Sequence, residues 1–155
     1  TEPQFPDMPQ ASPGTTVLAV GTDLVHIPGF ETQLDQPGSV FAQRAFTARE
    51  LREAHRRAQE KGSRPAQHLA ARWAAKEAFV KAWSAALYAS PPPVDPLDVD
   101  WREIEVVFDA WNRPALRLHG RIDREYAASF DGPCPGLLVS ISHDGDYAIA
   151  EVLIS

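Results

Sequence analysis

One alanine-rich stretch, residues 69–83 (LAARWAAKEAFVKAW), constrains the fold of this chain more than any other. It contains no Gly or Pro, and alanine has the highest helix propensity of the amino acids. Its large apolar side chains recur at spacings of three, four and seven, as in a helix with one buried face; they are Leu69, Trp73, Val80 and Trp83. We therefore predict one long helix, with Pro65 in its first turn.

Glu77 falls in phase with this apolar stripe, four residues after Trp73 and three before Val80. An ionised carboxylate among apolar side chains has to be paired with a cation, because its burial is otherwise too costly. Lys81, one turn further on, could form an ordinary (i, i+4) ion pair with Glu77. Taken alone, that simple interpretation is the favoured one.

A second carboxylate, Asp23, lies within the apolar run of residues 17–25, which is typical of a buried strand and which Pro28-Gly29 ends. With a period of two, Asp23 shares a face of that strand with apolar or small residues; they are Val17, Ala19, Gly21 and Val25. Two carboxylates presented from apolar surroundings, without a Cys or a His pair, suit a hard cation such as Mg²⁺.

The remaining elements predict the fold class. A capping box from Thr47 to Glu50 begins a charged helix that ends near Gly62. The C-terminal third favours strands at 104–108, 115–119, 137–143 and 147–154, with a short helix at 120–129 and a hairpin turn at Asp144-Gly145. Strands come first and last, which indicates an α+β fold with helices packed on one face of a largely antiparallel sheet.

We expect residues 1–14, which contain four prolines, to form a flexible tail, and residues 15–155 to form one domain. The sequence contains no run of 18 apolar residues, so we predict no membrane span. The N-terminal residues do not resemble a signal peptide. The single Cys134 permits no internal disulfide. These features favour a cytoplasmic protein that spans no membrane.

The charge distribution bears on the partner. The net charge of −6 argues against a general nucleic-acid binder. Between Arg44 and Lys81, however, ten basic residues stand against four acidic ones. Such a basic segment suits either a phosphorylated small molecule or an acidic protein, although solvated basic helix faces would give the same pattern.

Four motifs, in this order, resemble those of the holo-acyl-carrier-protein synthases, the small 4'-phosphopantetheinyl transferases. They are residues 20–25 (VGTDLV), 41–47 (FAQRAFT), 72–82 (RWAAKEAFVKA) and 140–143 (SISH). The resemblance covers about residues 17–154. It implies transfer of the 4'-phosphopantetheine group of coenzyme A to a serine of an apo acyl carrier protein, with release of adenosine 3',5'-bisphosphate, as fatty acid synthesis requires.

The resemblance also implies roles for individual residues. Asp23 and Glu77 would ligate Mg²⁺, and Lys81 would face the phosphates and stabilise the leaving group. The serine proton would pass to a metal-bound water or to Glu77. The residues implied at the coenzyme are Arg72, Lys76, Lys81, Arg113, Pro114, Ser142 and His143. From composition alone, a hydrogen-bonded turn residue is the slightly favoured interpretation of His143.

The family resemblance implies a homotrimer with the active site between subunits, so that Arg113 or His143 would reach in from a neighbour. Two positions depart from the family pattern. Asn112 stands where the family often has Gly, and Asn tolerates a left-handed backbone best among the other residues. Residues 26–30 lack the basic side chains that meet an acidic carrier in many relatives. Four arginines could replace them, namely Arg44, Arg49, Arg52 and Arg56, or the carrier could be a domain of a larger synthase.

Two other classes of function stay open on the sequence. The chain could be a non-catalytic module of the same fold that binds coenzyme A or a carrier protein. It could also be a structural oligomerisation domain in which Glu77 and Lys81 form a helix ion pair. The presence of both Asp23 and Glu77 favours the transferase, because a pure binding role does not need both carboxylates.

Overall fold

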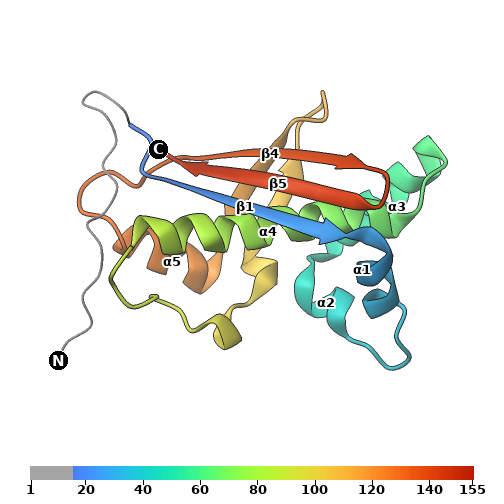
Figure 1. The fold of residues 1–155 in the computed structure, drawn as a ribbon, viewed down its shortest axis with the longest axis horizontal. Coiled ribbons are helices and arrows are strands. Elements are labelled where there is room, and N and C mark those ends of the chain that lie inside the picture. Colours follow the sequence, from blue (N-terminus) through green and yellow to red (C-terminus); the bar gives the residue numbers. More distant parts are fainter. Residues whose placement is uncertain (1–15) are drawn as a thin grey trace.

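The computed structural model describes residues 16–155, which have the predicted α+β architecture (Figure 1). The predicted tail of residues 1–14 lies outside the described residues. In chain order the elements are β1 (Ala19–His26), α1 (Ile27–Leu34), α2 (Phe41–Ala45), α3 (Ala48–Lys61), α4 (Pro65–Ala86), β2 (Ile104–Phe108), β3 (Pro114–Leu118), α5 (Gly120–Ala128), β4 (Leu137–Asp144) and β5 (Tyr147–Ile154), with short 3-10 helices at Pro96–Asp98 and Trp101–Glu103.

The strands form two antiparallel sheets rather than the one sheet that we predicted. β1, β5 and β4 make a three-stranded sheet in that order, and β2 pairs with β3. Asp144 pairs with Tyr147, so the hairpin turn consists of Gly145 and Asp146, one residue later than predicted. β5 is the central strand because the first strand of the chain adds to its free edge, a long-range pairing that local patterns do not reveal.

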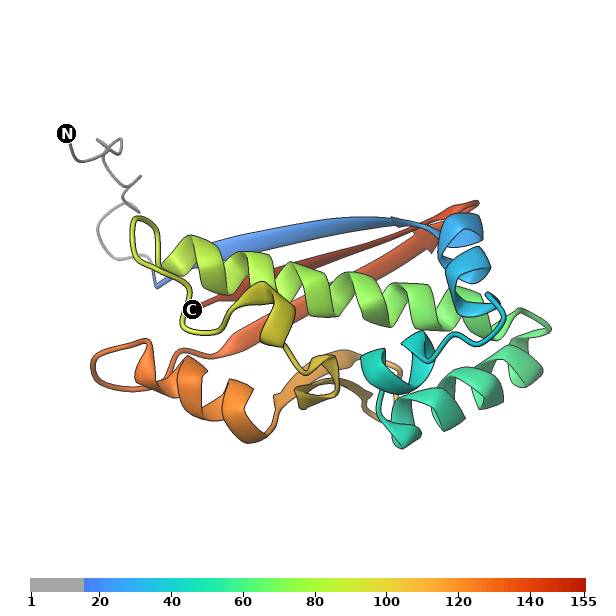
Figure 2. The same cartoon turned by 90° about the horizontal axis from the view of Figure 1, so that it is seen from below.

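Helix α4 begins at Pro65 as predicted, but it is buried on almost all sides instead of on one face. It contacts β1 and β5 on one side and α3 and β2 on the other. In Figure 2 it runs between the three-stranded sheet and the layer that holds α3 and α5. Its fully buried alanines, such as Ala70 and Ala74, let neighbouring elements approach closely, whereas Trp73 and Val80 are only half-buried.

The segment after β1 also differs from the prediction. Pro28 and Gly29 do not simply end the strand, because they form the first turn of α1. Nδ1 of His26 accepts a hydrogen bond from the backbone N–H of Gly29 at 3.3 Å and so caps the helix. Pro28 is favourable there because a first-turn N–H has no partner within a helix. The short helix α2 was also not predicted.

The capping box at Thr47 is confirmed. Its hydroxyl accepts from the backbone N–H of Glu50 at 3.1 Å, and the Glu50 carboxylate accepts from the N–H of Thr47 at 2.9 Å. Gly62 ends α3 with a left-handed φ of 63°. Within residues 16–155, no helix combines the length and the apolar character that crossing a bilayer demands.

Candidate active site

β1 presents Asp23 to α4, as the alternation of the strand predicted. Ala19, Gly21, Asp23 and Val25 are buried, and the residues between them are exposed. Gly21 allows an unusually close approach of the two elements, because a Cβ atom there would lie 2.1 Å from the carbonyl oxygen of Ala78 and 2.5 Å from the nitrogen of Ala82. This contact brings the side chain of Asp23 against the turn of α4 that carries Glu77 and Lys81.

Lys81 binds Asp23 rather than forming the helix ion pair with Glu77. Its Nζ donates a hydrogen bond to Oδ1 of Asp23 at 2.8 Å and a second to the carbonyl oxygen of Thr22 at 3.1 Å. The hydrogen bond to Asp23 raises the pKa of Lys81 above its usual value. The Lys81 side chain is 57% exposed and that of Asp23 is 8% exposed, so an exposed ammonium covers a buried carboxylate.

Glu77 is half-buried beside Asp23. Burial, followed by a hydrogen bond to the Asp23 carboxylate and by its negative charge, raises the pKa of Glu77 to about 7, and the Lys81 ammonium opposes this rise. A carboxyl group with so high a pKa is stabilised either by a proton shared with its neighbour or by a nearby cation. We refer to Asp23, Glu77 and Lys81 as the carboxylate site.

The carboxylate site fits a divalent cation. Among the described residues, no hydrogen-bond donor meets Oδ2 of Asp23, although this atom is buried. While both carboxylates are ionised, neither has a hydrogen to offer the other, so a cation would satisfy this oxygen. Residues 16–155 contain no cluster of three or more His, Cys, Asp or Glu side chains that could hold a metal ion. A pair of carboxylates suits Mg²⁺, which typically takes its other ligands from water and from substrate phosphates.

Other predicted site residues gather at a second place, a cavity of about 270 Å³. We refer to it as the cationic cavity. Its lining residues are Arg57, Lys61, His68, Ala71, Arg72, Phe108, Asn112, Pro114, Ile141 and His143. Arg72, Pro114 and His143 were predicted at the coenzyme, whereas His68 and Phe108 were not singled out. The position of His68, four residues before Arg72 on one helix, is a signal that could have identified it.

Arg72 is 1% exposed and has hydrogen-bonding capacity to spare. Its Nη1 donates to the carbonyl oxygen of His68 at 3.0 Å, and its guanidinium lies 4.7 Å from the centre of the Phe108 ring. Within the described part of the chain, its Nε and Nη2 donate no hydrogen bond. Burial lowers the pKa of Arg72 to about 10, so the group remains cationic at neutral pH. Nη2 lies 3.8 Å from Oε2 of Glu53, an ion pair too long for a hydrogen bond. Cationic donors without a hydrogen bond beside a cavity favour an anionic ligand.

The two histidines of the cationic cavity differ in their surroundings. Nε2 of His68 lies 2.8 Å from the Ser63 hydroxyl, and burial, aided by Arg72, lowers the pKa of His68 to about 4. His68 is therefore neutral at physiological pH. His143 is exposed near the end of β4, where its Nδ1 lies 2.8 Å from Nε2 of Gln67.

Arg113 and Ser142 do not line the cationic cavity. Arg113 is exposed on the β2–β3 hairpin, where its Nε donates to Asp109 at 2.6 Å. The neighbouring Asn112 has a left-handed φ of 67°. Asn therefore adopts here the backbone conformation that Gly, which the family often has at this position, adopts most easily. Ser142 is exposed, and strand alternation turns it to the face of β4 opposite His143.

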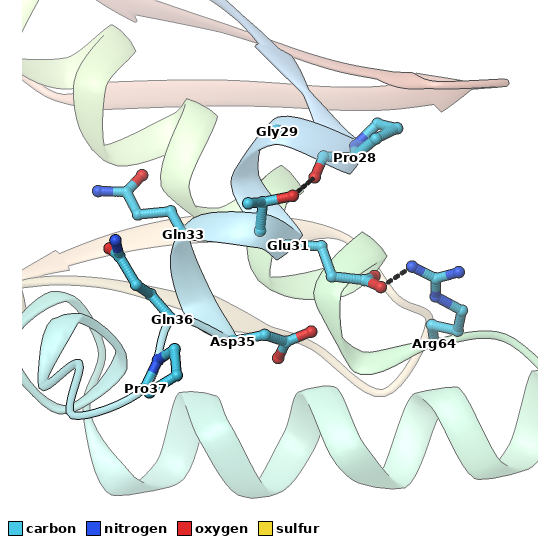
Figure 3. A pocket seen from close by; sticks show the side chains of 9 residues that line it. Pro28, Gly29, Glu31, Gln33, Asp35, Gln36, Pro37 and Arg64 are labelled. Carbon is cyan, nitrogen blue, oxygen red and sulfur yellow. Dashed lines mark hydrogen bonds and ion pairs between the residues drawn. The ribbon is translucent and has the colours of Figure 1, made fainter.

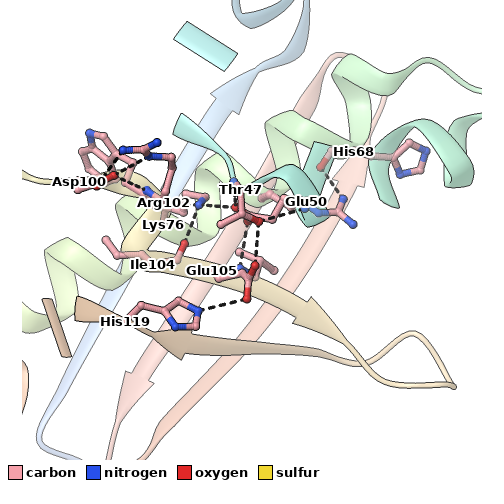
Figure 4. A network of polar contacts seen from close by, with 12 residues as sticks. Thr47, Glu50, His68, Lys76, Asp100, Arg102, Ile104, Glu105 and His119 are labelled. Atoms are coloured by element: carbon pink, nitrogen blue, oxygen red, sulfur yellow. Dashed lines mark hydrogen bonds and ion pairs between the residues drawn. The ribbon is translucent and has the colours of Figure 1, made fainter. Parts of the chain in front are cut away.

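Lys76, also predicted at the coenzyme, lies inside the protein. Its side chain is fully buried, and its Nζ donates to Oε1 of Glu50 at 2.8 Å, to the carbonyl oxygen of Trp101 at 2.9 Å and to that of Ile104 at 2.6 Å (Figure 4). All the hydrogens of the ammonium are thereby used within the protein. The sequence places Lys76 beside Glu77, but the helix turns it towards the opposite layer, where its ammonium has no hydrogen left for another ligand.

The carboxylate site and the cationic cavity lie at opposite edges of the three-stranded sheet. Asp23 belongs to β1 and His143 to β4, and β5 runs between these two strands. Along α4, Arg72 and Glu77 are separated by roughly 140° of helical rotation. One copy of the chain therefore does not bring the two groups of predicted site residues together.

Comparisons with known proteins agree with this architecture. The family model described as the 4'-phosphopantetheinyl transferase superfamily matches residues 19–151. The holo-[acyl-carrier-protein] synthase of Corynebacterium efficiens is 51% identical over 139 residues, which cover 90% of this chain and 94% of that protein. The protein of the same name from Mycobacterium tuberculosis is 49% identical over 138 residues, which cover 89% and 96% of the two chains.

Solved structures give the same result. An ACPS–CoA complex from Chronobacterium ammoniagenes has a TM-score of 0.79 and 48% identity to this chain, and the match covers 88% of this chain and 95% of that one. The acyl carrier protein synthase of Mycobacterium tuberculosis has a TM-score of 0.66 and 41% identity, with coverage of 90% and 97%.

Proposed function

The chain belongs to the 4'-phosphopantetheinyl transferase superfamily, and we propose how its residues divide the work of that reaction. The protein is a holo-[acyl-carrier-protein] synthase, which transfers the 4'-phosphopantetheine group of coenzyme A to a serine of an apo acyl carrier protein. The serine oxygen bonds to the phosphorus that carries the pantetheine arm. The bond from that phosphorus to the adenosine 3',5'-bisphosphate oxygen breaks, and fatty acid synthesis uses the holo carrier.

The observation that carries the assignment of roles is the carboxylate site. Asp23 and Glu77 would hold Mg²⁺ between them, because the Oδ2 atom of Asp23 has no donor among the described residues and Glu77 is destabilised as an anion. Bound Mg²⁺ would supply positive charge to the diphosphate oxygens. Lys81, whose ammonium is half exposed beside Asp23, would stabilise the negative charge that develops on the leaving group.

The cationic cavity is proposed to hold phosphates of the coenzyme. Arg72 supplies N–H donors that make no hydrogen bond within the described residues, and His143 offers an exposed ring at the cavity wall. Arg57 and Lys61 add positive charge on the side of α3. Because the cavity and the carboxylate site lie at opposite edges of the sheet, we propose that a complete active site combines the carboxylate site of one copy with the cationic cavity of another.

A homotrimer would satisfy this requirement, and the outer face of the sheet supports it. This face carries exposed apolar side chains on all three strands, namely Val20 at 48%, Leu24 at 60%, Leu138 at 60% and Ile149 at 42% exposure. These side chains flank a polar row of Thr22, Glu151 and Ser140 on the same face, and so much exposed apolar surface is typical of an interface. A closed ring of copies would bury it and would place the edges β1 and β4 of neighbouring copies together.

Recognition of the carrier protein is proposed to involve α3 more than α1. A cavity of about 720 Å³ borders α1, and its lining includes Glu31 and Asp35, with Arg64 as its one basic residue (Figure 3). Arg64 is ion-paired with Glu31. On α2 and α3, by contrast, Arg44 and Arg52 are exposed and have no acidic partner within residues 16–155. They are therefore available to an acidic carrier, either free or embedded in a synthase.

The cellular location is also a proposal. The single cysteine, Cys134, is exposed and free. A free exposed thiol suits a reducing compartment, and the coenzyme A substrate is used in the cytoplasm, where we place the reaction.

Intact-mass spectrometry of an apo carrier protein tests the proposed function. The carrier is incubated with the protein and coenzyme A, in Mg²⁺ or in EDTA. We expect the mass of one phosphopantetheine arm to be added only in Mg²⁺, and Glu77→Gln to fold but lose this turnover. Equal transfer in EDTA would contradict the metal role. A failure with free and synthase-embedded carriers alike, with coenzyme A still bound, would support the non-catalytic module instead.

A further inference from the structure

Lys81 occupies one oxygen of the Asp23 carboxylate, the group that would ligate a metal ion at the carboxylate site. Its Nζ lies 2.8 Å from Oδ1 of Asp23, while Oδ2 of the same carboxylate is buried and meets no donor within the described residues. The ammonium therefore neutralises one oxygen of Asp23, and the other has no donor while Glu77 is ionised. The hydrogen bond to the carbonyl oxygen of Thr22 fixes Lys81 over the strand at the same time.

This arrangement can be reversed at low cost. The Lys81 side chain is 57% exposed and ends in a flexible four-carbon stem. Its two acceptors, Asp23 and Thr22, lie on one strand, so a single swing of the side chain releases both. An exposed ion pair of this kind is typically weak, which contrasts with the fully buried Lys76.

Charge repulsion and attraction determine whether Asp23 binds the Lys81 ammonium or a divalent ion. A divalent ion between Asp23 and Glu77 would repel the Lys81 ammonium from its present position, because like charges a few ångströms apart destabilise each other. A diphosphate beside the site would attract the same ammonium. Each ligand therefore favours the position of Lys81 that the other also favours.

We infer that Lys81 is a displaceable counter-cation of the Asp23 carboxylate, and that its transfer to phosphate oxygens makes the binding of the divalent cation and of coenzyme A mutually dependent. This inference rests on the proposed function for the identity of the two ligands. It adds that Lys81 competes with the metal in the free protein, although it assists the phosphates in the loaded one. By linkage, each ligand tightens the binding of the other by the same factor.

The test measures Mn²⁺ binding to the complete protein by electron paramagnetic resonance, with and without coenzyme A. In the wild type, we expect coenzyme A to tighten Mn²⁺ binding. Lys81→Met should bind Mn²⁺ at least roughly fivefold more tightly than the wild type when coenzyme A is absent. The same variant should show a smaller gain on addition of coenzyme A. Lys81→Gln, which keeps a polar but neutral group, should behave in the same way.

Two controls accompany these variants. Arg52→Met removes one exposed positive charge on α3 and should leave both Mn²⁺ affinities within about twofold of the wild type. Asp23→Asn should abolish Mn²⁺ binding in both conditions, which locates the ion at the carboxylate site. Circular dichroism and the urea midpoint establish that each variant is folded.

The outcomes separate the inference from the proposed function. If Mn²⁺ binds in the presence of coenzyme A but Lys81→Met binds it no more tightly than the wild type in its absence, the inference is overturned and the metal site stands. If Mn²⁺ does not bind in either condition, the metal assignment itself fails and the inference fails with it. Tighter binding in Arg52→Met as well would reduce the effect to overall charge and would also overturn the inference.

Discussion

The Nζ atom of Lys76 lies 2.8 Å from Oε1 of Glu50, and neither side chain is exposed to solvent. The pair joins α4 to α3, and Oε2 of Glu50 also accepts the backbone N–H of Val106 at 3.1 Å, which connects β2. Burial lowers the pKa of Lys76, while Glu50 opposes this. The pair therefore holds three elements in register behind the face of α4 that carries Glu77.

Lys76→Met should destabilise the fold by about 3–5 kcal/mol, because it leaves the Glu50 carboxylate buried without its cation. Urea unfolding measures this loss. The double variant Lys76→Met with Glu50→Gln should recover a large part of it, since the buried charge is then absent. Arg56→Met, which breaks an exposed pair with Glu60, should cost less than about 1 kcal/mol. An equal cost for both single variants would refute this structural role.

Gly21→Ala should separate β1 from α4. The added Cβ would lie 2.1 Å from the carbonyl oxygen of Ala78, a backbone atom that cannot move alone. We expect a loss of about 1–3 kcal/mol in the free energy of unfolding and a loss of transferase activity, because Asp23 moves with the strand. Gly136→Ala is the matched control, since its Cβ would come no closer than 3.7 Å to Ser155. Equal stability of the two variants would contradict the close contact.

The pKa of Glu77 predicts a pH dependence of stability. Its folded-state pKa of about 7 exceeds the ordinary value of 4.5, so the folded protein holds this proton more tightly than the unfolded chain does. The stabilisation is fully present below pH 4.5 and is lost as the pH rises to 7. Relative to Glu77→Gln, the metal-free wild type should lose on the order of 2 kcal/mol over this range, after discounting the shift for solvent screening.

Urea unfolding of both proteins at several pH values, without divalent cations, gives this difference directly. The comparison cancels the titration of carboxyl groups that do not interact with Glu77; Asp23 does interact with it, so the difference reports the Asp23–Glu77 pair. Stabilities of wild type and Glu77→Gln that run parallel from pH 4.5 to 7 would contradict a raised pKa for Glu77.

Leu138→Glu should dissociate the proposed homotrimer. Leu138 is 60% exposed on the outer face of the sheet, where a carboxylate would oppose burial by another copy. Sedimentation velocity should show a smaller species, and activity should fall with it. Leu97 is 94% exposed outside the sheet, so Leu97→Glu should keep the assembly of the wild type. A trimer that survives Leu138→Glu would argue against this face as the interface.

Mixed assemblies test whether two copies share an active site. Glu77→Gln and His143→Ala should each lower activity, the second by about tenfold through loss of a phosphate contact. When the two variants are co-expressed, random assortment should restore complete sites at roughly a quarter of the interfaces. Activity in the mixture no greater than the mean of the separate variants would show that each copy supplies both residues to its own site.

Much of the fold followed from local patterns in the sequence. Pro65 and the alanine-rich run predicted α4, Thr47 and Glu50 predicted the start of α3, and strand alternation predicted the buried face of Asp23. Each of these features depends on neighbours within a few residues, where propensity and periodicity act directly. The two carboxylates could be singled out for the same reason, since each interrupts an apolar pattern.

The tertiary structure decided the partners of these residues. Periodicity gives the face on which a side chain lies but not the segment that packs there. Lys81 therefore pairs with Asp23, 58 residues away, in place of Glu77, and Lys76 pairs with Glu50, 26 residues away. The strand order β1-β5-β4, set by long-range pairing, separates Asp23 from His143. The sequence alone determined which residues we propose for the chemistry, and the packing of distant segments decided which of them meet within one copy.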